Sequence, residues 1–82
     1  MLNNDIERSI LAAFVSQNGR FTFRKAVSIA FYECPNDYTK QQILKITTVV
    51  LNHALDHSLI KAHGYDLYES ALCNLPYEEK IF

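Results

Sequence analysis

Residues 51–69, LNHALDHSLIKAHGYDLYE, contain the point at which the sequence pattern changes from helical to extended. Before residue 58, apolar residues recur every three or four positions, as they do along one face of a helix. After it, two short runs, 59–62 and 65–69, flank the pair His63-Gly64. Strand-like runs separated by a short turn that contains glycine predict a β-hairpin. We therefore expect a helix to end here and a small sheet to follow.

Three amphipathic segments precede the hairpin, at about residues 4–17, 23–33 and 39–57. Thr22 is a candidate N-cap for the second segment. This segment should end near Glu33, because Pro35 disfavours helical geometry at the residue before it. Thr39 and Gln42 have the spacing of a capping box at the start of the third segment. A very short extended piece, 21–23, separates the first helix from the second. The predicted class is mainly α with a small β-hairpin.

Composition indicates one small domain. The chain has 82 residues, 49% of them hydrophobic, with only two glycines and two prolines. We expect a domain over 1–70 and a tail over 71–82 that docks or dimerises. The N-terminal residues lack the pattern of a signal peptide, and no apolar run is long enough to span a membrane. A cytoplasmic location follows as an expectation, with Cys34 and Cys73 reduced and packed as small apolar residues. A secreted protein with one disulfide is the alternative.

Ten aromatic side chains are available to build the core. Those expected in the core are Phe14, Phe21, Phe23, Phe31, Tyr65 and Tyr68. A helical turn is expected over 69–74. The apolar residues beyond it, Tyr77, Ile81 and Phe82, can fold back on the first helix or cross to a second subunit. Dimerisation is favoured because a core of this size benefits from a partner.

The predicted order of helix, short strand, helix, turn, helix and hairpin resembles the winged helix-turn-helix superfamily. The resemblance covers about residues 6–69 and is carried mainly by the stretch quoted above. In it Ser58 stands where the family commonly has a glycine, and the matching apolar positions are Leu59, Ile60, Tyr65, Leu67 and Tyr68. The fold that this resemblance implies has three helices and a two- or three-stranded wing.

The resemblance also implies that the third helix enters a DNA major groove. It assigns DNA contacts to side chains of the third helix, the second helix and the wing: Lys40, Gln41, Gln42, Lys45, Thr48, Arg24, Lys25, Lys61 and His63. The implied protein is a small sequence-specific transcription regulator of bacterial, phage or plasmid type that binds double-stranded DNA as a homodimer. Residues 20–61 contain six basic and three acidic side chains, although the whole chain has a formal net charge of −1.

The low net charge keeps open a different function, because DNA-binding proteins usually have a basic excess. The alternative is a winged-helix module that binds a protein, such as a phage-encoded inhibitor or modulator of a host protein complex. A metal site is not expected at His53 and His57, because Ala54 replaces the glutamate of zinc-protease helices and no third ligand is evident. We expect neither a cofactor nor enzymatic activity, since no nucleophile has a partner base in the sequence.

Overall fold

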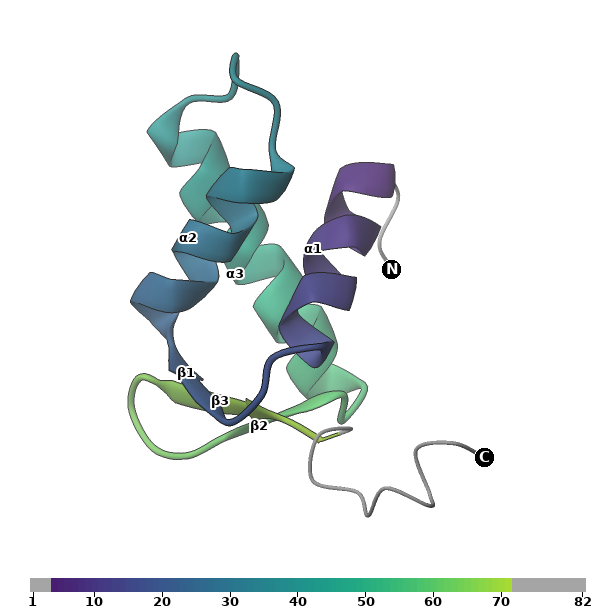
Figure 1. Ribbon diagram of the computed structural model, residues 1–82, viewed down its shortest axis with the longest axis vertical. Coiled ribbons are helices and arrows are strands. Elements are labelled where there is room, and N and C mark those ends of the chain that lie inside the picture. The colour runs from purple at the N-terminus through teal and green to yellow at the C-terminus, as the bar shows by residue number, and fades with distance from the viewer. Residues whose placement is uncertain (1–3, 72–82) are drawn as a thin grey trace.

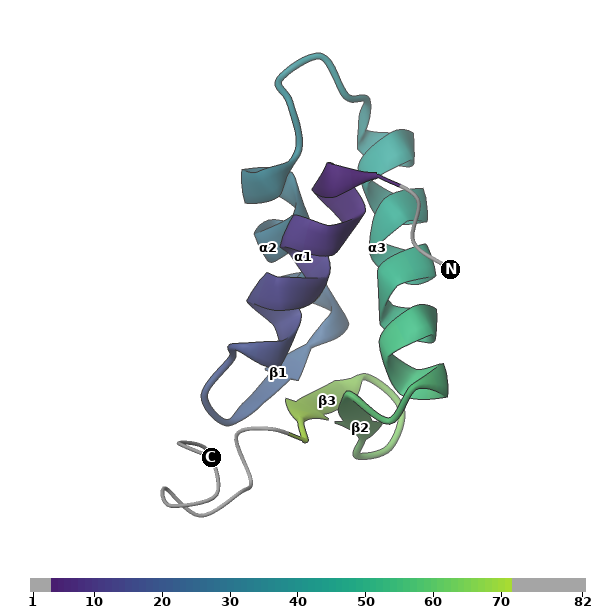
Figure 2. The same ribbon diagram turned by 90° about the vertical axis from the view of Figure 1, so that its right-hand side faces the viewer.

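Three helices stand on a small antiparallel sheet in the computed structural model, which describes residues 4–71 (Figures 1 and 2). In chain order the elements are α1 (Asp5–Val15), β1 (Arg20–Thr22), α2 (Phe23–Glu33), α3 (Lys40–Asp56), β2 (Ile60–Ala62) and β3 (Leu67–Ser70). The sheet lies at one end of the helices, called here the sheet end. The α2–α3 connection lies at the other, the turn end. A mainly helical fold with a small sheet is therefore confirmed.

The predicted helix starts are formed by the expected caps. The Thr22 hydroxyl oxygen accepts a hydrogen bond from the Lys25 amide at 3.1 Å. At α3 the Thr39 hydroxyl accepts from the Gln42 amide at 3.1 Å, and Gln42 Oε1 accepts from the Thr39 amide at 2.7 Å. This reciprocal pair is the predicted capping box. It satisfies amides that have no partner within the first turn of a helix.

The end of α3 closes with a Schellman motif whose central residue is Ser58. The Leu59 amide donates to the carbonyl of Ala54 at 2.8 Å, and the Ser58 amide donates to that of Leu55 at 3.1 Å. Ser58 has a φ of 58°, in the left-handed region that glycine adopts most easily. The position at which the resembled family commonly has a glycine is thus one where this chain holds serine in a costly conformation.

The predicted hairpin is confirmed, with shorter strands and a wider turn. The Phe21 region adds a third strand, since the order is β1-β3-β2 with both pairs antiparallel. Tyr65, expected in the core, is instead fully exposed. The reason is that strand pairing resumes only at Leu67, while Asp66 turns its carboxylate to the Phe23 amide at 3.0 Å. Tyr65 consequently lies in the turn.

The core joins the helices to the sheet through buried aromatic rings. Phe14 and Phe21 are buried, with ring centroids 6.0 Å apart, and Phe21 lies 5.9 Å from the ring of the partly buried Tyr68. The buried Ser70 hydroxyl donates to the Val15 carbonyl at 2.6 Å, which fastens β3 to the end of α1. The core roles expected for these three rings are confirmed, and Phe23 also packs partly buried against the core.

Phe31 was expected in the core and is 66% exposed. The fully buried residues of α2 are Ala26 and Ala30, which define the side of the helix that faces the core. Successive residues turn by about 100° around a helix, so Phe31 is rotated well away from Ala30. Its ring lies on the flank of α2 instead, and Tyr32 beside it is 88% exposed.

The chain beyond β3 begins at Ala71, whose amide donates to the Leu59 carbonyl at 3.0 Å. The helical turn expected over 69–74 is wrong for its first two residues, because Glu69 and Ser70 belong to β3. The other predictions for the tail, including those for Cys73 and Tyr77, fall outside the described residues. Within 4–71, no helix combines the length and the apolar character needed to cross a membrane.

Candidate functional site

The residues predicted to contact DNA fall at both ends of the molecule. Arg24 and Lys25 occupy the first turn of α2 at the sheet end, whereas Lys40 and Gln41 occupy the first turn of α3 at the turn end. The two helices run in opposite directions (Figure 1), and α2 alone is about 16 Å long. The predicted set therefore does not form one compact patch.

A ladder of charged side chains crosses the sheet. Glu69 of β3 stands opposite Arg20 of β1 and Lys61 of β2. Its Oε1 lies 3.9 Å from the Arg20 Nε and 2.6 Å from the His63 Nε2. The sequence-predicted His63 is thus partly buried and already paired with a carboxylate. Arg20 was not predicted as a site residue, although its position directly before the buried Phe21 places it on the opposite face of the strand.

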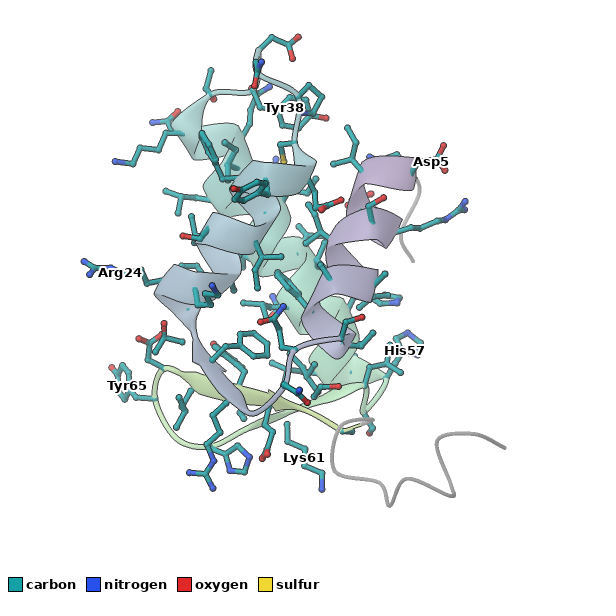
Figure 3. All side chains as sticks on the ribbon, viewed as in Figure 1. Asp5, Arg24, Tyr38, His57, Lys61 and Tyr65 are labelled. Atoms are coloured by element: carbon teal, nitrogen blue, oxygen red, sulfur yellow. The ribbon has the colours of Figure 1, made fainter. Side chains whose placement is uncertain are left out.

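Four exposed cations gather at the sheet end: Arg20, Arg24, Lys25 and Lys61. Three carboxylates lie at the same end. That of Asp66 accepts from a backbone amide, that of Glu69 faces His63 and Arg20, and the exposed Asp56 ends α3. Among residues 4–71, four cations against three carboxylates leave this end with an excess of one positive charge. Figure 3 shows Arg24 and Tyr65 on one side of this end and Lys61 below the sheet.

The exposed side of α3 carries Gln41, Lys45 and Thr48, which recur at intervals of four and three residues. Such spacing places them along one face of the helix. The Thr48 hydroxyl donates to the Leu44 carbonyl at 3.0 Å. Gln42 is less available than predicted, because its Oε1 is occupied in the capping box. Lys40, Gln41 and Lys45 remain as the predicted DNA contacts of α3 whose side-chain groups are not bonded within the helix itself.

An apolar groove of about 430 Å³ separates α2 from α3 near the turn end. Its apolar lining comes from Val27, Phe31, Tyr32, Tyr38 and Ile43. We call this hollow the α2–α3 groove. Ser28 and Lys40 supply its polar groups. A second hollow adjoins it and shares the Phe31 and Tyr32 rings, so both rings project between two concave surfaces.

His53 and His57 lie side by side with ring centroids 4.3 Å apart, as their spacing predicts. His57 caps the end of α3, and its backbone amide donates to the His53 carbonyl at 3.1 Å. In the described part of the chain, no three histidine, cysteine, aspartate or glutamate side chains are grouped so that they could hold a metal ion.

Cys34 is buried where α2 ends, as its predicted apolar role requires. Burial raises the pKa of its thiol, and the negative charge of Glu33 adds to the effect. The protonated form is therefore favoured, which argues against a reactive thiolate.

Comparisons of this chain with protein-family models, with curated proteins and with solved structures find no match.

Proposed function

We propose that this protein is a winged-helix DNA-binding regulator of transcription, in which α3 faces the major groove and the sheet end contacts the phosphate backbone. Support for the architecture comes from the order of its elements, three helices with a hairpin after the third, and from the short strand before α2 that completes the sheet. Support for the ligand comes from the chemistry of two surfaces.

The observation that carries the proposal is the set of four exposed cations at the sheet end. Arg20 and Lys61 flank Glu69 across the sheet, and Arg24 with Lys25 follows in the next turn of chain. Cationic side chains that contact phosphates release bound counterions, and this release supplies much of the affinity of a protein for DNA. The exposed amide of Gln41 and the ammonium of Lys45 are of types that bond adenine and guanine edges in the major groove.

The test is a titration of fluorescent duplex DNA, followed by anisotropy, at two salt concentrations. Three or four phosphate contacts give a slope of about −2.7 to −3.6 in log K against log salt. Affinity should then fall about 40- to 150-fold between roughly 50 mM and 200 mM salt. A chain that does not bind even at low salt, or that binds without this salt dependence, would overturn the proposal.

Matched variants locate the surface. Arg24→Gln and Lys61→Gln each remove one sheet-end cation and should reduce the magnitude of the salt slope by about 1. Arg8→Gln is the control, because Arg8 is an exposed cation of α1 that pairs with Asp5 at 3.5 Å. Its slope should stay that of the parent. Equal losses in all three variants would show that binding responds to net charge alone.

A separate variant tests α3 as the reader. Gln41→Ala with Lys45→Ala should weaken binding to a preferred sequence more than to random duplex, because base contacts carry the sequence information. If discrimination between the two duplexes is unchanged, α3 does not read the bases.

The second candidate function is the recognition of another protein. The observation that favours it is the α2–α3 groove, beside which Phe31 and Tyr32 expose aromatic surface. Aromatic residues are enriched at protein interfaces. This candidate is favoured over the first if the chain does not bind DNA at low salt and binds another protein through the groove.

A further inference from the structure

The α2–α3 groove has the properties of an interface without a partner in the described chain. Its floor includes Ile43, which is only 5% exposed, while Phe31 and Tyr32 project from its side. Single exposed apolar residues are ordinary on a protein surface, but a contiguous apolar concavity with aromatic rims is typical of binding sites. This surface lies at the turn end, away from the cations of the sheet end.

One cation borders the groove, because Lys40 contributes to its lining. A ligand that fits should therefore combine apolar side chains with carboxylates.

The segment 72–82 of this chain, LCNLPYEEKIF, has this composition. Its apolar side chains include Leu75, Tyr77 and Phe82. Between the last two lie the carboxylates of Glu78 and Glu79 and the ammonium of Lys80, so the side chains of the segment have one negative charge in excess. We propose that the α2–α3 groove binds segment 72–82 of a second copy of the chain, and that two copies exchange these segments reciprocally. A reciprocal exchange closes a twofold dimer, so that both grooves are filled.

The reach of the segment favours a second copy over the same molecule. Ala71 is held beside Leu59, just past the end of α3, and the groove lies near the start of α3. The length of α3 is about 25 Å at 1.5 Å per residue. Leu75 and Tyr77 lie four and six residues beyond Ala71 and reach at most about 14 and 20 Å when fully extended, whereas Phe82, eleven residues beyond, could reach about 37 Å. Within one molecule only the end of the segment could therefore enter the groove, whereas a second copy can place the whole segment there.

Photocrosslinking with the full chain identifies the occupant. A benzophenone amino acid replaces the exposed Tyr32, and chains labelled with ¹⁴N and ¹⁵N are mixed, illuminated and digested for mass spectrometry. Crosslinks from position 32 to segment 72–82 in mixed-isotope pairs are expected. Crosslinks only within one isotope, crosslinks to other segments, or no crosslink at all would overturn the proposal. So would capture of a different protein in cells without any self-crosslink.

Sedimentation equilibrium measures the strength of the contact. Phe31→Ala should raise the dimer dissociation constant at least about 30-fold, as expected for an exposed aromatic ring that an interface buries. Tyr65→Ala is the control, because it removes an even more exposed ring at the sheet end and should leave the constant unchanged. Equal effects of the two variants, or a parent chain that stays monomeric, would contradict the proposal.

A charge exchange tests the orientation of the segment. Lys40→Glu alone should weaken the dimer, and so should Glu78→Lys with Glu79→Lys. Combining all three changes in one chain should restore association. Each groove would then present a carboxylate at position 40 to two ammonium groups, at positions 78 and 79, of the other copy. Additive weakening in the combined variant would show that these residues do not face one another.

Discussion

Replacing Ser58 by glycine should stabilise this protein by about 0.5 to 1 kcal/mol. Ser58 has a φ of 58°, and its left-handed conformation costs a residue with a Cβ atom about 1–2 kcal/mol. Glycine removes this cost but gives the unfolded chain more freedom, which lowers stability by about 0.4–1 kcal/mol. Both Schellman hydrogen bonds use backbone atoms only, so they persist in the variant. The difference is a net gain.

The assay is thermal and urea unfolding followed by circular dichroism. A gain of this size corresponds to roughly 2 to 8 °C in Tm for a domain of this length. Ser58→Ala keeps the Cβ atom and therefore the conformational cost, so its stability should stay within about 0.5 kcal/mol of the parent.

Ser16→Gly provides the opposite control. Ser16 caps the end of α1 with a φ of −87°, and its hydroxyl donates to the Ala12 carbonyl at 2.7 Å. Glycine there relieves no left-handed strain and removes a hydrogen bond, so this variant should lose stability. If Ser58→Gly is no more stable than Ser58→Ala, the reasoning about the left-handed cap is refuted.

Three further predictions follow from buried or capping groups. Ser70→Ala should cost about 1–3 kcal/mol, because the Val15 carbonyl loses a buried donor at 2.6 Å; unfolding in urea measures it, and a neutral result would contradict the contact. Thr39→Ala should cost about 1 kcal/mol by removing the capping box of α3, and Thr39→Ser, which retains an accepting oxygen, should recover most of it. The raised pKa of Cys34 means that folding favours the protonated thiol, first through burial and then through Glu33. Its contribution is therefore present below the ordinary thiol pKa, about 8.5, and is lost as pH rises above it, so stability from about pH 8 to 10 should fall more in the parent than in Cys34→Ala.

Much of the local structure could be predicted from the sequence because it depends on neighbouring residues. The Thr39–Gln42 capping box connects residues three apart, and the end of α2 is set by Pro35 two residues later. The hairpin could likewise be predicted, since a period-two pattern on either side of Gly64 favours it. These features require no knowledge of distant parts of the chain.

The sequence did not determine which side of each predicted element meets the core. Phe31 belongs to an apolar stripe by its spacing, yet α1 and α3 cover α2 on the side of Ala26 and Ala30, which leaves the Phe31 ring at the groove. A helical pattern several residues wide permits either rotation, and only the packing of the other helices selects one. The exposure of Tyr65 has a similar origin, because the long-range bond from the Phe23 amide to the Asp66 carboxylate shapes the turn.

The sequence by itself determined the helices, their caps and the hairpin, because short-range hydrogen bonds and periodic apolar spacing decide these. Only the tertiary structure decided how the charged residues meet. Arg20 and Lys61 are 41 positions apart, and antiparallel pairing with β3 places both opposite Glu69. The α2–α3 groove, too, exists only where two helices pack. Neighbours across strands and between helices depend on register and packing, which involve the whole chain at once.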